Sequence, residues 1–209
     1  MSLQAAQTKK LIAGAKDLNQ ELNQLQVEKL VRYLELLRKW NETYNLTAIT
    51  EPSRVISHHI LDSLSIAPYL RGSRLLDLGS GAGLPGLPLA ILFADKRFIL
   101  LDSSGKKTRF LHQVCMDLEL SNIEVVNERA ERFSQQTFDS VLVRALGSLK
   151  KIALTAAHLL AENGVILAMK GELTKLELSE VPENIKVHGI HTLLVPGVSG
   201  NRNLVTLTK

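Results

Sequence analysis

The chain has 209 residues, 45% of them hydrophobic, which is enough for one sizeable core with an extension but short for two full domains. No apolar run approaches the roughly 20 residues of a membrane-spanning helix, and a single cysteine, Cys115, excludes an internal disulfide and a cysteine-rich metal site. The polar N-terminus shows no secretory signal, so we expect a cytoplasmic protein, and the net charge of +4 permits a polyanionic partner without requiring one.

Residues 1–70 are predicted to form an N-terminal helical extension. Apolar residues recur at helical spacing over residues 27–40, with charged residues on the opposite side, which indicates a face that packs against the rest of the chain. The pattern stops at residues 41–45, where we expect a loop. A second helix is expected over residues 52–67, because a proline is acceptable at its start.

This second helix carries polar side chains that share a face. His59 and Asp62 are three residues apart, so they lie side by side on an α-helix and are most simply a hydrogen-bonded packing pair. The adjacent histidines His58 and His59, without a third ligand, are weak support for a metal site. We therefore expect no metal.

Beyond residue 70, strands alternate with helices, which predicts an α/β core over residues 71–209 built on a mostly parallel sheet. Two final segments alternate like a hairpin and are expected to close the sheet in antiparallel fashion. The expected parallel strands are residues 75–78, 98–102, 123–127, 138–145 and 165–169, and the expected hairpin is residues 185–195 and 204–208.

A glycine-rich loop follows the first strand and precedes an apolar helix expected over residues 84–92. Gly79, Gly81 and Gly83 allow positive φ angles and a close approach of the backbone to a ligand. Strand, loop and helix N-terminus together predict a nucleotide-type pocket at the carboxyl edge of the sheet. The three glycines fit a dinucleotide as well as other ligands, so their specificity is low.

Asp77, two residues before the first glycine, discriminates between ligands. A carboxylate there is unfavourable beside a pyrophosphate but attracts a positively charged ligand. S-adenosylmethionine carries a sulfonium and an ammonium group and has no phosphate. The spacing from Asp77 to Gly83 resembles the first motif of class I methyltransferases.

The next two strands end in residues suited to an adenosine. Asp102 ends the second strand, where a carboxylate can accept both ribose hydroxyls of NAD or of S-adenosylmethionine, or can instead cap the following helix. Ala130 and Glu131 follow the third strand and are placed to line an adenine edge, although a surface loop is the default expectation for them.

Basic residues near the same edge are candidates for holding anions. Lys106, Lys107 and Arg109 open a helix, where their charges oppose the helix dipole unless an anion lies nearby. They can hold RNA phosphates or simply form a solvated helix face, and the residues favour neither. Arg144 ends the fourth strand at the ligand-binding edge, where a partly buried charge needs a partner.

Together these blocks resemble one family, the bacterial glucose-inhibited division protein B group of small-subunit ribosomal RNA guanine-N7 methyltransferases. They follow the family's order across nearly the whole chain, and the Gly-x-Pro-Gly-x-Pro run is the most distinctive block. The matching stretches are residues 45–47, 59–64, 77–88, 101–103, 106–107, 110–111, 129–131, 144–145 and 170–171.

The resemblance implies a class I (Rossmann-like) enzyme that methylates N7 of one guanosine in the 16S ribosomal RNA hairpin near the decoding centre. Two positions depart from the family pattern. His58 stands where the family often has arginine, which concerns a phosphate contact, and Val143 stands where serine usually precedes Arg144, which concerns a small polar contact. The resemblance carries over Gly79, Leu84, Ala130, Glu131 and Arg144 by position. The full set assigned to S-adenosyl-L-methionine is Asp77, Gly79, Gly81, Leu84, Asp102, Ala130, Glu131 and Arg144, and the set assigned to RNA is Lys106, Lys107, Arg109 and Lys170.

Guanine N7 has a free lone pair at neutral pH, so the reaction needs alignment and no general base. We assign no catalytic base. The expected partner is small-subunit ribosomal RNA or the small ribosomal subunit, and we expect a monomer without a membrane or metal partner. Three rival functions stay open at this point: an NAD(P)-dependent oxidoreductase, a non-catalytic RNA-binding protein and a methyltransferase for a small molecule.

Overall fold

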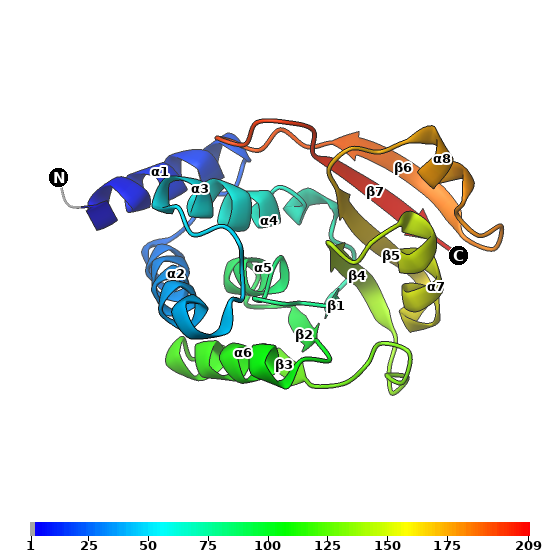
Figure 1. Ribbon diagram of the computed structural model, residues 1–209, viewed down its shortest axis with the longest axis horizontal. Helices are drawn as coiled ribbons and strands as arrows, with labels where there is room; N and C mark the ends of the chain where they lie inside the picture. The colour runs from blue at the N-terminus through cyan, green and yellow to red at the C-terminus, as the bar shows by residue number, and fades with distance from the viewer. Residues whose placement is uncertain (1–2) are drawn as a thin grey trace.

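A computed structural model describes residues 3–209 and places one twisted sheet at the centre of the molecule (Figure 1). Over these residues the sheet has seven strands in the order β3-β2-β1-β4-β5-β7-β6. The strands are β1 (Arg74–Leu78), β2 (Arg97–Leu101), β3 (Ile123–Val126), β4 (Phe138–Arg144), β5 (Leu160–Lys170), β6 (Lys186–Thr192) and β7 (Asn203–Thr208).

The first five strands are parallel, and β7 pairs antiparallel with both β5 and β6. This arrangement confirms the predicted α/β fold with a C-terminal antiparallel hairpin. Strands β2 and β3 are added on one side of β1, and β4 and β5 are added on its other side. The order in which strands are added therefore reverses at β1. Ligands of open α/β sheets bind in the crevice outside the carboxyl ends of the strands at such a reversal.

Helices cover both faces of the sheet (Figure 1). On one face, α1 (Leu3–Asp17), α2 (Gln24–Tyr44), α5 (Gly86–Leu92) and α6 (Gly105–Asp117) form one hydrophobic cluster with alternate residues of the strands, such as Leu75 and Leu100. Of these helices, α5 and α6 contact the strands, and α2 packs on both of them. On the other face, α7 (Leu149–Ala156) packs on the intervening residues, such as Leu76 and Leu101. The predicted N-terminal extension therefore shares the hydrophobic core of the sheet.

The α2 helix is longer than its apolar pattern predicts. Asn23 and Gln26 form a reciprocal capping box at its start, and the helix runs through the residues for which we expected a loop. Trp40 and Tyr44 stack with ring centroids 5.2 Å apart, which extends the packing by one further turn. Asn45 then takes a left-handed conformation, with φ of 50°, and ends the helix.

The predicted helix over residues 52–67 is not one regular α-helix. It consists of α3 (Pro52–Val55), a π-helix η1 (Ile56–Leu61) and α4 (Asp62–Leu64), with the short 3₁₀ helix η2 (Ala67–Tyr69) after it. Every residue of η1 and α4 is buried. A π-helix changes which side chains share a face, so the three-residue spacing of an α-helix does not apply across it.

The remaining elements lie close to their expected positions. The helix after the glycine loop begins at Gly86, two residues later than expected, and the Leu84–Pro85 peptide bond is cis. The 3₁₀ helix η3 (Ala157–Leu159) follows α7, and α8 (Lys175–Ser179) lies in the connection after β5. Within the described residues, no helix combines the length and apolarity needed to cross a membrane.

Candidate active site

The glycine loop follows β1 at the reversal of strand order. Gly79, Gly81 and Gly83 all have positive φ angles, which side chains other than glycine rarely adopt. The backbone N–H groups of Gly79 and Ser80 both donate to the Leu101 carbonyl, at 2.8 and 3.1 Å, and so tie the loop to the end of β2. The loop is thus held against the edge of the sheet where a ligand is expected.

A buried tyrosine of the N-terminal helices also holds this loop. Tyr33 lies in α2, has no exposed surface, and donates its hydroxyl to the Ala82 carbonyl at 2.8 Å. The two residues are 49 positions apart, so no local pattern indicates this contact. The extension therefore does more than cover the sheet, because it positions the glycine loop.

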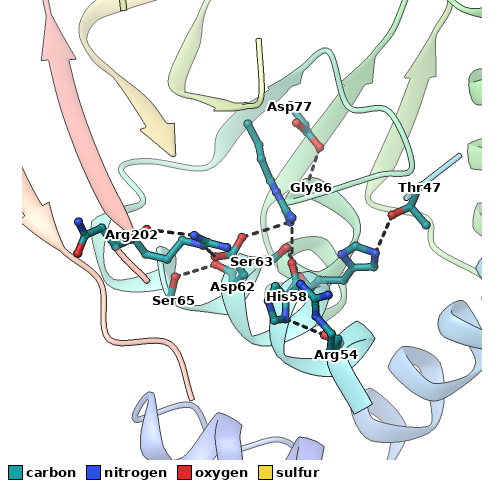
Figure 2. A network of polar contacts seen from close by, with 12 residues as sticks. Thr47, Arg54, His58, Asp62, Ser63, Ser65, Asp77, Gly86 and Arg202 are labelled. Carbon is teal, nitrogen blue, oxygen red and sulfur yellow. Dashed lines mark hydrogen bonds and ion pairs between the residues drawn. The ribbon is translucent and has the colours of Figure 1, made fainter. Parts of the chain in front are cut away.

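Asp77 is placed differently from the sequence interpretation. Its carboxylate has no exposed surface, and Oδ2 accepts a hydrogen bond of 2.8 Å from the Gly86 N–H (Figure 2). Its side chain therefore reaches the start of α5 rather than a ligand surface. Burial raises the pKa of Asp77 to about 7, although the Gly86 hydrogen bond and the Arg144 charge oppose that rise. This geometry favours a role in fixing the loop over direct contact with a cationic ligand.

Asp77→Asn should change how stability depends on pH. The buried carboxyl keeps its proton up to about pH 7, whereas an unfolded chain loses it near 3.8, so the folded state binds the extra proton between these values. The free energy of unfolding of the wild type therefore falls as pH rises from about 4 to about 7, because ionisation of Asp77 is easier in the unfolded chain. The variant lacks this effect, so its free energy of unfolding relative to wild type should rise across that window and level off above it. Urea unfolding across this range measures the difference, and a constant difference would contradict the raised pKa.

A cavity of about 290 Å³ lies beside the glycine loop, at the carboxyl ends of β1, β2 and β4. Its walls combine apolar side chains, including Leu78 and Leu146, with charged ones. Five of the residues that the sequence assigned to the cofactor line this cavity: Gly79, Asp102, Ala130, Glu131 and Arg144. The structure therefore brings together most of the predicted set.

Two other predicted cofactor residues are not among those lining this cavity. Gly81 donates its N–H to Asp102 Oδ2 at 2.9 Å, so it contributes to the wall indirectly. Leu84 packs in the hydrophobic core on the α2 face of the sheet. The Leu84 side chain is therefore a core residue, and its expected contact with the cofactor through the glycine loop stays a prediction.

Asp102 organises the cavity wall with both oxygens of its carboxylate. Oδ1 accepts from the Ser104 N–H at 2.9 Å, while Oδ2 accepts from Gly81 and lies 3.4 Å from Lys107 Nζ. The side chain is almost fully buried. The next helix, α6, begins after Ser104 without a side-chain cap, so the alternative role of Asp102 as a helix cap is wrong. The carboxylate borders the cavity where ribose hydroxyls were expected.

Arg144 ends β4 and borders two cavities. Its Nη2 donates to the His58 carbonyl at 2.9 Å, and its Nη1 lies 3.3 Å from Asp62 Oδ2. A second cavity, of about 230 Å³, is also lined by Arg144 and lies towards β5 and β7. The expectation that this charge needs a partner is met by α4 and the π-helix.

Asp62 joins Arg144 to Arg202, a contact that the sequence interpretation missed. Asp62 is 3% exposed, and its Oδ1 lies 3.2 Å from Arg202 Nε. Figure 2 shows the Arg202 side chain reaching Asp62. Burial raises the pKa of Asp62, and the two guanidinium groups oppose that rise. Arg202 immediately precedes β7, 140 positions from Asp62, so no local spacing could reveal the pair.

The predicted His59–Asp62 pair is wrong, because Asp62 turns to the arginines. His59 Nε2 instead lies 3.0 Å from the Thr47 hydroxyl (Figure 2). Burial, followed by the Arg144 charge, lowers the pKa of His59 to about 4, so this imidazole is neutral at pH 7. Across the described residues, no group of three or more His, Cys, Asp or Glu side chains could hold a metal ion.

The four residues assigned to RNA divide into two groups. Lys106 and Arg109 are exposed on α6, where Lys106 Nζ donates to the Tyr44 carbonyl at 3.2 Å. Lys107 instead pairs with Asp102 at the first cavity. Lys170 is largely buried, with its Nζ 2.6 Å from Glu177 Oε1 and 2.7 Å from the Gly147 carbonyl, so its charge is already neutralised.

Solved structures that resemble this chain share its fold. TrmN from Thermus thermophilus superposes with a TM-score of 0.56 at 18% identity, over 74% of this chain and 53% of that one. Fibrillarin from Aeropyrum pernix, solved with natively bound S-adenosyl-L-methionine, superposes with a TM-score of 0.53 at 14% identity, over 68% of each chain. At these identities the likeness shows a methyltransferase-type fold alone.

Closer relatives carry a more specific name. A protein from Ectopseudomonas mendocina named ribosomal RNA small subunit methyltransferase G is 45% identical over 212 residues, which span 100% of this chain and 99% of its own. Its namesake from Methylococcus capsulatus is 48% identical over 195 residues, or 93% of this chain and 95% of its own. The GidB family, described as rRNA small subunit methyltransferase G, matches residues 26–205. The chain belongs to this family.

Proposed function

We propose that this protein transfers a methyl group from S-adenosyl-L-methionine to N7 of one guanosine in 16S ribosomal RNA, in the hairpin near the decoding centre. The observation that carries the proposal is the match to the family over nearly the full chain. The position of the first cavity, at the strand-order reversal beside a glycine loop, agrees with it.

The first cavity suits the chemistry of this cofactor. Its carboxylates, among them Asp102 and Glu131, can accept hydrogen bonds from ribose hydroxyls, and its apolar walls favour an adenine ring. We assign Gly79, Gly81, Asp102, Ala130 and Glu131 to holding the cofactor. The cofactor supplies an electrophilic methyl group on its sulfonium, and the protein supplies the alignment.

The residues of this chain fit a reaction that needs no proton transfer before methylation. Guanine N7 attacks through a lone pair that is free at neutral pH, so the rate depends on holding N7 in line with the methyl group. His59 is neutral at pH 7 and donates to or accepts from Thr47, so it is not poised as a general base towards the cavity. Arg144, at the border between the two cavities, is the residue best placed to orient the substrate.

The exposed cations of α6 are proposed to contact RNA phosphates. Lys106→Gln combined with Arg109→Gln should weaken RNA binding and reduce the slope of log affinity against log salt by roughly one unit per lost phosphate contact. Lys107 is left in place because it pairs with Asp102. Binding of the RNA at several salt concentrations measures the slope.

The control for this pair removes the same charge elsewhere. Lys96→Gln with Arg97→Gln lies at the amino end of β2, away from the proposed site. The control should leave the salt slope unchanged, while cofactor affinity should stay the same in both double variants. An unaltered slope in the α6 variant would make this cluster a solvated helix face.

The partner and the setting follow from the proposed reaction. We propose that the substrate is small-subunit ribosomal RNA or the small subunit itself, that the enzyme acts as a cytoplasmic monomer, and that it uses no metal. We also propose that residues 1–70 are an extension of the core of residues 71–209, since Tyr33 supports the glycine loop.

Transfer of labelled methyl groups to ribosomal RNA tests the proposed function. The RNA is taken from cells that lack this protein, and chemical cleavage at 7-methylguanosine maps the modified base. We expect one labelled guanosine in the small-subunit RNA and none in RNA from cells that contain the protein. Absence of transfer would support a non-catalytic RNA-binding protein, and calorimetric binding of NADH in place of S-adenosylmethionine would support an oxidoreductase.

A further inference from the structure

The second cavity lies next to the proposed cofactor cavity but has a different lining. It measures about 230 Å³ and lies between the carboxyl ends of β4 and β5 and the start of β7. Arg144 and Ala145 line both cavities, so the two are neighbours. It is the smaller of the two cavities, which suits a single planar base better than a whole nucleoside cofactor.

The charges around the second cavity leave an excess of donors. Lys170 is neutralised by Glu177, so the effective charges are Arg144 and Arg202 against Asp62. Two guanidinium groups and one carboxylate leave one positive charge. A ligand group with oxygen or nitrogen lone pairs is therefore favoured here over a further cation.

Asp62 forms ion pairs with both arginines at the wall of the second cavity. Its two oxygens lie 3.2 Å from Arg202 Nε and 3.3 Å from Arg144 Nη1, and the carboxylate itself is 3% exposed. Within the described residues, Nη1 of Arg144 is buried without a hydrogen-bond partner of good geometry. The Arg144 side chain as a whole is 22% exposed, so its guanidinium remains open to a ligand at the border of the two cavities, and Asp62 determines its direction.

We propose that this cavity receives the target guanine, that Arg144 donates to guanine O6, and that Asp62 is the positioning residue for that contact. The inference rests on the proposed methylation of guanine. O6 and N7 lie on the same edge of the base, so a donor to O6 at the border turns N7 towards the cofactor cavity. Adenine presents an amino donor in place of O6, and the two guanidinium groups therefore reject it.

The test compares two bases at the mapped position of small subunits assembled in vitro. One substrate carries guanosine, and the other carries 2-aminopurine riboside, which keeps N7 but lacks O6. Wild type should prefer guanosine in kcat/KM by roughly 10- to 100-fold, the size expected when a hydrogen bond to a charged group is lost. In Asp62→Asn and in Arg144→Lys this preference should shrink to a few-fold, because the donor is misdirected or absent.

Asp139→Asn is the matched control, because it also removes a carboxylate that pairs with an arginine. Asp139 Oδ1 lies 3.3 Å from Arg74 Nη2 at the opposite edge of the sheet. This control should keep the wild-type preference. Calorimetric cofactor affinity confirms that each variant is folded, and Arg144→Lys decides the outcome if Asp62→Asn does not fold.

Two results would overturn the inference. Equal kcat/KM of wild type on the two substrates would show that O6 is not recognised. An equal loss of kcat/KM on both substrates in the variants would show that Asp62 and Arg144 have only a structural role. Neither result touches the proposed function, which depends only on methylation of guanosine by wild type. Failure of that wild-type reaction would instead reject the proposed function.

Discussion

Replacing Arg144 with Lys should slow methyl transfer by on the order of 100-fold while the protein still folds and binds its cofactor. Lysine keeps the positive charge but has no planar fork of donors, so it cannot contact His58 and Asp62 and also present an N–H to the substrate. Since the reaction is carried by alignment, a misplaced base costs rate directly. Single-turnover transfer to ribosomal RNA, with calorimetry for the cofactor, measures the two effects separately.

Arg74→Lys is the matched control for this substitution. Arg74 pairs with Asp139 across the amino ends of β1 and β4, and its side chain is half exposed, so a lysine there should cost at most about 1 kcal/mol. Its transfer rate should equal that of wild type. If Arg144→Lys also turned over at the wild-type rate, Arg144 would serve only to anchor the π-helix to the sheet.

The fold could be predicted from the sequence because its signals are local. Short apolar runs bounded by glycines gave the parallel strands, and the alternating segments near the C-terminus gave the antiparallel hairpin of β6 and β7. Boundaries were less accurate. The α2 helix continued past the end of its apolar pattern because Trp40 and Tyr44 stack and Asn45 supplies the left-handed cap.

Site residues at strand ends were also predictable, whereas the direction of their side chains was not. Asp102, Ala130 and Arg144 meet at one cavity because the carboxyl ends of parallel strands meet at one edge. Asp77 follows the same rule for its backbone, but its side chain turns to the Gly86 N–H beneath the loop. Lys170 ends a strand as well, yet its charge is taken by Glu177.

The contacts that the sequence interpretation missed join distant positions. Asp62 reaches Arg202 across 140 residues, and the π-helix just before Asp62 breaks the spacing on which the expected His59 pair depended. Tyr33 supports the glycine loop from a helix whose pattern indicated only packing. Each of these contacts depends on how elements pack together, and such information has no local pattern in one sequence.

Gly86→Ala should destabilise the protein by about 1–3 kcal/mol and disturb the glycine loop, because the position has no room for a methyl group. An added Cβ would lie 2.4 Å from Leu100 Cδ2 and 2.6 Å from Asp77 Oδ2, and all three residues are fully buried or nearly so. Gly86 lacks a positive φ, so space alone decides the effect. The midpoint temperature of thermal unfolding should fall by about 2–4 °C for each kcal/mol of stability lost in a domain of this size.

Gly105→Ala separates this steric effect from a general cost of adding a side chain to a helix start. Gly105 begins α6 as Gly86 begins α5, but an added Cβ there would meet only Asn127 Oδ1, at the ordinary contact distance of 3.6 Å. Its stability should equal or slightly exceed that of wild type, because alanine loses less backbone entropy on folding. Cofactor affinity should fall in Gly86→Ala alone, since the Asp77 carboxylate that receives the Gly86 N–H is forced to move. A Gly86→Ala variant with the unfolding midpoint and the cofactor affinity of wild type would contradict this prediction. The start of α5 would then relax without disturbing the loop, and Asp77 would not hold that loop in place.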